Sequence, residues 1–185
     1  MRIHLGCGRR RLADCVNLDR VPLPSVDVVA DLERDLPFAD DAFDGAKAVH
    51  VLEHIDRLLP LLAELHRVCR DGSTIEIEVP HFSFFTAYTD PTHRRFFGFH
   101  TFDDLTRASP YHYVHTVRFA LRRRRLRYFW IKNEQRTVPS RMLTALLNRW
   151  PLLYERFFCW WLPVHQIDFE LSVRKPVRTS SNSPS

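Results

Sequence analysis

The sequence predicts an α/β fold whose sheet is mostly parallel. The first 80 residues alternate short apolar runs with turn signals, and one amphipathic helix pattern stands among them. Strands separated by connecting segments of this length are expected to pair in parallel. Two later segments, 115–130 and 167–176, alternate apolar and polar residues in part or throughout, as half-buried strands do. These two strands are expected to be antiparallel neighbours at the sheet edge.

The first 50 residues are expected to form four short strands. They span residues 3–5, 15–18, 26–30 and 45–49, and a glycine or a polar residue follows each strand or ends it. Such punctuation at the end of each apolar run is typical of strands that enter loops.

A helix is expected to begin at Asp56, which suits an N-cap. Apolar residues then recur at helical spacing, at Leu58, Leu61, Leu62, Leu65, Val68 and Cys69. Gly72 is expected to end this helix. The β-branched segment 74–80 predicts a fifth strand directly after it.

The segment between the two late strands, at about 131–164, is rich in leucine, phenylalanine and tryptophan. Pro151 and Pro163 divide it into two expected helical pieces, at 141–150 and 152–162. We expect this insertion to line or cover the substrate site. A dimer contact and an amphipathic element on a membrane surface are the alternatives.

Length and composition favour one soluble domain. The 185 residues suffice for a sizeable core, so residues 1–178 are expected to form a single domain, with a disordered tail at 179–185. No uncharged apolar run reaches the roughly 18 residues that a membrane span needs, and no secretory signal is expected. The four cysteines form no C-x-x-C pair, which indicates reduced thiols in a cytoplasmic protein.

Polar features fall at the expected carboxyl ends of four strands. They are Gly6, Cys7 and Gly8 after the first strand, Asp19 after the second, Asp31 after the third and His50 after the fourth. Ligands of open α/β sheets bind beyond the carboxyl ends of the strands. Glycines let the backbone approach a ligand, and an acid after the second strand accepts hydrogen bonds from ribose hydroxyls. The pattern indicates a cofactor that contains a nucleoside.

The spacing argues against two common nucleotide sites. A dinucleotide fingerprint needs a third glycine where this chain has Arg11, and Asp19 follows Gly8 by only 11 residues rather than about 20. A phosphate-binding P-loop is absent as well. The glycine pair taken alone is equally compatible with a tight turn, with Asp19 capping a loop.

A longer pattern resembles a known family. The segments LGCG, NLD, VVADLERDLPFADDAFD, VHVLEHI and LHRVCRDGSTIEIEVP occur in this order within residues 2–80. Together they resemble class I S-adenosylmethionine (SAM)-dependent methyltransferases of the type 11 group. The resemblance implies a Rossmann-like class I methyltransferase sheet, mostly parallel with an antiparallel last hairpin, with helices on both faces. It also implies SAM as the cofactor.

The resemblance assigns a part of SAM to each strand end. It places Gly6 and Gly8, with Cys7 between them, against the methionine part, and Asp19 on the ribose hydroxyls. It places Asp31 and Leu32 beside the adenine and His50 near the sulfonium. Two positions depart from the common pattern: His4 stands where an acid is usual, and Arg10 stands where a third glycine is usual. These departures are expected to shift affinity or local geometry rather than to abolish the site.

The segment 81–105, after the fifth strand, is the expected substrate side. Its many aromatic residues suit a small-molecule or sugar substrate. His81 is the first candidate for a general base and His93 the second. A metal held by His81, Asp90 and His93 is conceivable, but their spacing matches no standard motif, so no metal is expected. His50 and His54 stand at i, i+4, yet Glu53 between them does not make an H-E-x-x-H motif.

The leading hypothesis is a SAM-dependent methyltransferase acting on a small molecule or on a sugar, including a lipid-linked one. The alternatives are a catalytically silent SAM-fold binding module and an RNA- or DNA-modifying methyltransferase. The arginine run 122–127 motivates the last alternative, but a solvated edge strand explains it better, so nucleic acid is not favoured as a partner. Peripheral membrane contact and a homodimer are kept as candidate associations.

Overall fold

The computed structural model of the protein describes residues 1–106, 117–128 and 138–176. The tail expected at 179–185 and the first part of the expected insertion, residues 131–137, lie outside these described residues.

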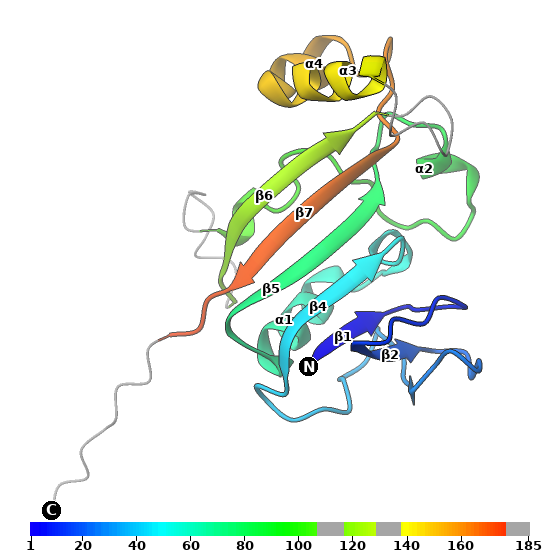
Figure 1. The fold of residues 1–185 in the computed structure, drawn as a ribbon, viewed down its shortest axis with the longest axis vertical. Coiled ribbons are helices and arrows are strands. Elements are labelled where there is room, and N and C mark those ends of the chain that lie inside the picture. The colour runs from blue at the N-terminus through cyan, green and yellow to red at the C-terminus, as the bar shows by residue number, and fades with distance from the viewer. Residues whose placement is uncertain (107–116, 129–137, 177–185) are drawn as a thin grey trace, which may run out of the picture.

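One seven-stranded sheet forms the centre of the molecule, with the strand order β3-β2-β1-β4-β5-β7-β6 (Figure 1). The strands are β1 (Arg2–Leu5), β2 (Cys15–Asp19), β3 (Val28–Val29), β4 (Phe43–Val49), β5 (Cys69–Pro80), β6 (Phe119–Arg127) and β7 (Gln166–Val173). The strands from β3 to β5 pair in parallel, and β7 pairs antiparallel with both of its neighbours. The expected mixed sheet with an antiparallel last hairpin is confirmed.

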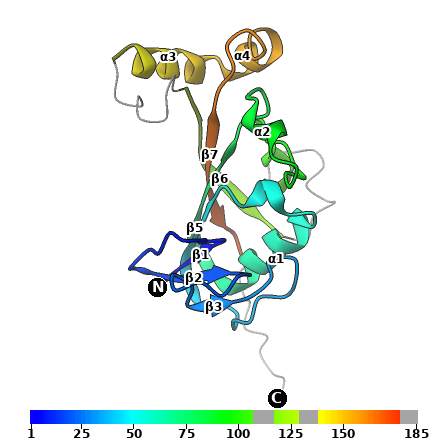
Figure 2. The ribbon, with the colours of Figure 1, turned by 90° about the vertical axis from the view of Figure 1, so that its right-hand side faces the viewer.

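Within the described residues, four α-helices accompany the sheet: α1 (Leu58–Val68), α2 (Thr86–Thr89), α3 (Val138–Arg149) and α4 (Pro151–Phe157). Two short 3₁₀ helices, η1 (Leu52–His54) and η2 (Asp103–Leu105), stand in the connections. Helices α1 and α2 lie on one side of the sheet, and α3 reaches the other side only at the far end of the strands (Figure 2). Most of the helical cover expected on both faces is therefore concentrated on one.

The two faces of the sheet differ because buried apolar and more exposed polar residues alternate along strands such as β5 and β7. Apolar side chains such as Ile75 and Ile77 of β5 pack with the buried leucines of α1 in one core. The intervening residues form ion pairs on the opposite face, where Lys47 lies 3.5 Å from Glu76 and 3.3 Å from Glu78. Alternation of period two in β5 and β7 thus makes one apolar and one charged face.

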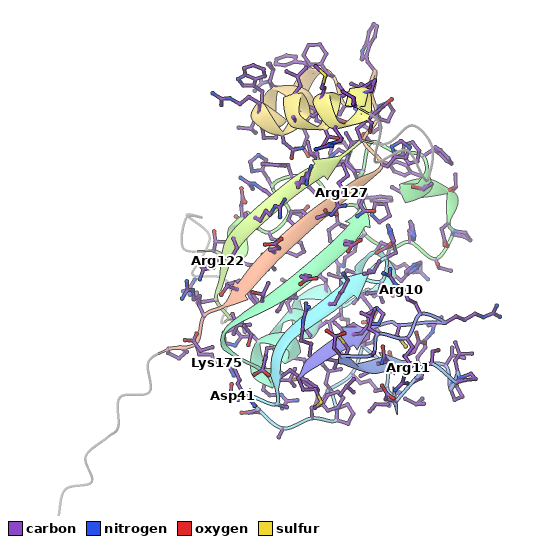
Figure 3. All side chains as sticks on the ribbon, in the orientation of Figure 1. Arg10, Arg11, Asp41, Arg122, Arg127 and Lys175 are labelled. Atoms are coloured by element: carbon purple, nitrogen blue, oxygen red, sulfur yellow. The ribbon has the colours of Figure 1, made fainter. Side chains whose placement is uncertain are left out.

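Arginine side chains of β6 form ion pairs at the edge of the sheet. Arg124 donates to Oδ1 of Asp103 at 2.5 Å and stacks over the ring of Phe99. Arg127 is paired with Asp168 of the neighbouring strand β7. Arg122 and Arg127 lie near opposite ends of this outermost strand (Figure 3). Charged side chains along an edge strand also discourage pairing with other chains.

Helix α1 begins and ends differently from the sequence expectation. Its N-cap position is Arg57, not Asp56, and the Glu33 carboxylate accepts from the N–H groups of Asp56 and Arg57 at 2.6 and 3.0 Å. No side chain caps the N-cap residue, and the Glu33 carboxylate instead binds the backbone just before the first helical residue. The helix ends at Val68, and Gly72 lies inside β5 with φ 77°.

Two other expected elements are shorter in the structure. Strand β3 keeps only Val28 and Val29 of the expected 26–30, because it is an edge strand that pairs with just two residues of β2. The second helical piece of the insertion ends at Phe157 rather than at residue 162.

Candidate functional site

The carboxyl ends of four strands lie side by side because β3, β2, β1 and β4 are consecutive neighbours that pair in parallel. The Gly8 N–H, in the loop after β1, donates to Oδ2 of Asp19 at the end of β2, at 2.8 Å. The Ala30 N–H, after β3, donates to the carbonyl oxygen of Asp19 at 3.0 Å. The fold therefore brings together the glycine loop, Asp19 and the chain that leads to Asp31.

Both glycines after β1 adopt left-handed backbone conformations, with φ 55° at Gly6 and 50° at Gly8. A Cβ on Gly6 would come within 2.3 Å of Cγ2 of Val51, in the segment after β4. A Cβ on Gly8 would meet nothing within 4 Å. Glycine is thus needed at position 6 for close packing, whereas Gly8 leaves open space beside the backbone.

The Asp19 carboxylate is oriented by backbone N–H groups. Its Oδ2 accepts from Gly8, and its Oδ1 accepts from Val21 at 3.0 Å. A carboxylate offers about four lone-pair sites, so each oxygen keeps acceptor capacity after these two bonds. The side chain holds a loop, as one of the two sequence interpretations expected, and it can still accept hydrogen bonds from the hydroxyls of a ribose.

The expected adenine side lies next along this edge. Asp31 is exposed, and its Oδ1 accepts from the Glu33 N–H at 3.0 Å. Leu32 is buried and packs in the core. A hollow of about 650 Å³ opens between residues 32–35 and α1, and Leu32 is the one predicted cofactor residue among its lining residues.

His50 follows β4 with φ 52°, a conformation that is uncommon for residues other than glycine. Its N–H donates to the Glu78 carbonyl at 2.8 Å, and its Nδ1 lies 3.4 Å from Oε1 of Glu53. The contact with Glu53 raises the pKa of His50, and burial only partly opposes this. The side chain is half exposed at the carboxyl-end edge.

The two departures from the common family pattern fit the site. His4 is buried, with its Nδ1 3.2 Å from Oδ1 of Asn17, and burial lowers the pKa of this imidazole.

The Arg10 N–H closes the glycine turn by donating to the Cys7 carbonyl at 2.9 Å. Arg10 and Arg11 lie at the end of the sheet formed by β1 and β2 (Figure 3). Neither departure displaces the contact between Gly8 and Asp19, so these residues fit a SAM-like ligand.

His81, the first candidate base, is fully buried directly after β5. Its Nδ1 accepts from the Ser83 N–H at 3.2 Å, and its Nε2 donates to Oε1 of Glu155 at 3.0 Å. Both ring nitrogens are therefore engaged within the protein. The second candidate, His93, lies elsewhere: its ring stacks edge-on against His54 at a centroid distance of 4.7 Å.

Glu53 is a residue of this region that was not among the candidates predicted from the sequence. It is 1% exposed and lies between His50 and the pair formed by His54 and His93. The available signal was a charged residue in the apolar segment VHVLEHI, which the structure buries at the end of β4.

The strand order and the loops at its carboxyl edge define a Rossmann-like sheet of the class I methyltransferase type. Residues 4–77 match the family model described as a methyltransferase domain. This part of the chain is thus similar to methyltransferase domains of that family, as the sequence motifs indicated, and the similarity implies SAM as the cofactor.

A curated relative and two solved structures illustrate the similarity. The O-methyltransferase rstn1 of Aspergillus nomiae is 49% identical over 43 residues, which are 23% of this chain and 19% of that protein. The chain thus spans about a fifth of the length of the curated relative that it matches.

The two solved structures share the fold across nearly the whole chain. The YcgJ protein of Bacillus subtilis has a TM-score of 0.58 at 13% identity, with 95% of this chain and 92% of that chain covered. A SAM-dependent methyltransferase of Archaeoglobus fulgidus has a TM-score of 0.56 at 18% identity, with coverages of 92% and 85%. At these identities the matches establish the fold.

Proposed function

We propose that this protein is a SAM-dependent methyltransferase that acts on a small molecule or a sugar, including a lipid-linked one. The observation that carries the proposal is the oriented Asp19 carboxylate beside Gly8, at an edge that four strand ends share. The matched methyltransferase domain supports the cofactor, and the short similarity to an O-methyltransferase supports an oxygen acceptor.

In this proposal each residue at the carboxyl-end edge of the sheet has a separate task. Asp19 accepts hydrogen bonds from the ribose, Gly6 and Gly8 admit the methionine part beside Cys7, and Asp31 and Leu32 flank the adenine. His50 stands at the end where the methyl group would be presented. When bound, SAM supplies an electrophilic methyl group, so the protein has to align the acceptor and help to remove its proton.

The two candidate histidines have different roles on the acceptor side of the proposed site. His81 is closed off by Ser83 and Glu155, so we assign it to holding the chain after β5 in place. His93 keeps its Nε2 beyond hydrogen-bond distance of the carboxylate of Asp90, at 3.9 Å. We therefore assign the activation of the acceptor to the neighbourhood of His93.

Replacing Asp19 by alanine should weaken SAM binding. Losing charge-assisted hydrogen bonds to the ribose should cost about 1.5–3 kcal/mol, which is roughly a 10- to 150-fold increase in Kd. Isothermal titration calorimetry with SAM and with its demethylated product measures the change. Asp14→Ala, which removes the same charge from an exposed position on the preceding loop, is the matched control. Equal affinities for the two variants would remove Asp19 from the proposed site.

Binding and turnover together separate the proposal from its alternatives. Transfer of a labelled methyl group to an acceptor supports the enzyme. SAM binding without transfer to any acceptor would favour the silent binding module. Oligonucleotide binding that falls steeply with salt would favour a nucleic-acid substrate.

We further propose that helices α3 and α4 rest on an anionic lipid surface. Helix α3 turns its polar residues inward: the Ser140 hydroxyl donates to the Tyr128 carbonyl at 2.8 Å, and the Asn148 amide donates to the Leu126 carbonyl at 2.8 Å. Its outward residues and those of α4 and the following turn are large, apolar and exposed: Val138, Met142, Leu146, Trp150, Leu152, Leu153, Phe157, Phe158, Trp160 and Trp161.

The charges around this apolar surface favour lipid over a second copy of the chain. The charged residues of segment 138–164 are Arg141, Arg149, Arg156 and Glu155. Glu155 turns inward to His81, so the exposed charges are all positive. Two such surfaces would repel each other, whereas anionic headgroups attract them. Within the described residues no helix has the length and apolar composition needed to cross a bilayer, so the contact would be peripheral.

Replacing Trp160 and Trp161 together by serine should reduce binding to anionic vesicles about tenfold or more, because both exposed rings lose their apolar contact. Sedimentation with phosphatidylglycerol-containing vesicles measures the partition coefficient, and pure phosphatidylcholine vesicles report the electrostatic share. Val21→Ser, which removes an exposed apolar side chain far from α4, is the control. A stable dimer in light scattering, with no vesicle binding, would contradict the lipid proposal.

A further inference from the structure

We infer that Glu53, His54 and His93 form a binding site for a divalent transition-metal cation of the Zn²⁺ type. One ligand atom from each residue lies within 4.8 Å of the other two. The segments meet because the Glu53 carbonyl accepts from the N–H groups of Arg94 and Arg95, at 2.7 and 3.1 Å. Backbone hydrogen bonds thus hold the chain around His93 against η1.

The Glu53 carboxylate is the strongest sign of a missing ligand. The residue is 1% exposed, and its Oε2 has no hydrogen-bond partner among the described residues. Its Oε1 lies 3.4 Å from Nδ1 of His50. Leaving a buried carboxylate oxygen without a partner is costly. A cation bound at Oε2 would remove that cost.

The hydrogen bonds of His54 and His93 prepare both rings for a cation. Nδ1 of His93 lies 3.0 Å from the Ala87 carbonyl, which can only accept, so this nitrogen carries the proton and Nε2 keeps its lone pair. A carbonyl bound to the second ring nitrogen is the usual support of a metal-binding histidine.

His54 is fixed in the same tautomer by a longer chain of hydrogen bonds. The Thr92 hydroxyl donates to Oδ1 of Asp90 at 2.6 Å and can therefore accept from Nδ1 of His54 at 2.8 Å. Nε2 of His54 is then the nitrogen with the free lone pair. Each of the two imidazole rings thus keeps one nitrogen whose lone pair can bind a cation.

The dimensions and the donor types select the class of ion. Ligand atoms about 2.1 Å from a tetrahedral ion lie roughly 3.4 Å apart, so the three side chains need to close by a modest rotation. Imidazole donors favour Zn²⁺ over Mg²⁺ or Ca²⁺, which prefer oxygen ligands. Three protein ligands leave a fourth position for water or substrate, as in catalytic zinc sites. The Asp90 carboxylate, 3.9 Å from Nε2 of His93, adds a second nearby negative charge.

The position of the site suggests its use, and this step rests on the proposed function. Glu53 contacts His50, which stands at the proposed methyl-presenting end of the cofactor edge. A hydroxyl oxygen of the acceptor bound at the fourth position would lose its proton more readily, to water or to the nearby Asp90 carboxylate, because the cation stabilises the alkoxide. The cation would thus perform the activation that we assign to the neighbourhood of His93.

Metal binding itself is tested without any turnover. Protein freed of metal with a chelator should bind one Zn²⁺ per chain in calorimetry, and Mn²⁺ more weakly. Glu53→Gln, His93→Ala and Thr92→Val should each weaken Zn²⁺ binding about tenfold or more, the last through the lost support of His54. His66→Asn, which removes a histidine on α1 that lies outside the cluster, should leave the affinity unchanged.

Folding and cofactor binding are measured on the same samples. Circular dichroism identifies any variant that fails to fold, and the exposed Thr92 provides a mild test if Glu53→Gln is unstable. Absence of saturable Zn²⁺ binding by the intact protein, or equal affinity in all variants, would overturn the site. If SAM then still binds, only the metal inference fails. If Zn²⁺ binds but SAM does not, the proposed function fails and the metal site stands.

Discussion

Replacing Glu155 by alanine is expected to lower the free energy of unfolding by roughly 2–6 kcal/mol. Oε1 of Glu155 accepts from Nε2 of His81 at 3.0 Å and from the Phe99 N–H at 2.6 Å. Both donors lie in part-buried or buried surroundings, and each would be left without this acceptor at about 1–3 kcal/mol. Urea denaturation followed by circular dichroism measures the change.

The loss should be large because Glu155 belongs to a connected polar network. The Ser83 hydroxyl lies 2.8 Å from Nδ1 of His81 and accepts from the Val164 N–H at 3.0 Å. The Tyr154 hydroxyl donates to the Leu162 carbonyl at 3.0 Å. This network joins the end of β5 to α4, so opening it loosens the attachment of the whole helix.

Two variants separate the network from a general effect of charge. Glu155→Gln keeps an acceptor oxygen and should cost less than half as much. Glu170→Ala removes a surface carboxylate that pairs with Arg123 at 3.4 Å and should change stability by less than about 1 kcal/mol. Equal unfolding midpoints for Glu155→Ala and Glu170→Ala would contradict the proposed anchoring of α4.

The same network predicts a dependence on pH. Burial acts to raise the pKa of Glu155, but the hydrogen bonds from His81 and Phe99 outweigh it, so the pKa is lowered. A carboxyl whose pKa is lower in the folded state stabilises the fold above its ordinary value of about 4.3. This contribution disappears as the pH falls through the lowered pKa. The stability difference between the intact protein and Glu155→Gln should therefore narrow below about pH 4.

Local sequence signals predicted where the glycine loop and Asp19 lie in the sheet. Gly6, Gly8 and Asp19 are each recognisable within a few residues of a strand end, and parallel strands bring their carboxyl ends to one edge by geometry alone. The alternation in β7 equally predicted a half-buried strand. These features depend on short-range patterns that the sequence displays directly.

Long-range contacts explain what the sequence did not reveal. The pairing of His81 with Glu155 joins residues 74 positions apart, so nothing near His81 indicated that its ring would be closed off. Glu33 binds the N–H group of Asp56, just before α1, from 23 positions away, and the sequence near Asp56 does not indicate this contact. The sequence also did not show which face of α3 points outward. A polar side chain of α3 binds the backbone of β6 instead of facing solvent, and no periodicity predicts this interaction.

Replacing Gly6 by alanine is expected to destabilise the protein by roughly 2–5 kcal/mol and to abolish tight SAM binding. The left-handed conformation at φ 55° should cost an alanine about 1–2 kcal/mol. The added Cβ would also lie 2.3 Å from Cγ2 and 2.9 Å from Cβ of Val51, so the two segments must move apart. Such overpacking typically costs about 1–3 kcal/mol more.

Gly8 and Val51 provide the comparison that separates these two costs. Gly8→Ala carries the same backbone strain, at φ 50°, without a new contact, so it should lose only about 1–2 kcal/mol. Val51→Ala in the Gly6→Ala background removes the clashing Cγ2 and should restore part of the lost stability and SAM affinity. A double-mutant cycle on urea midpoints and calorimetric Kd values measures that coupling. Additive effects of the two substitutions would mean that the glycine loop does not depend on its packing against the end of β4.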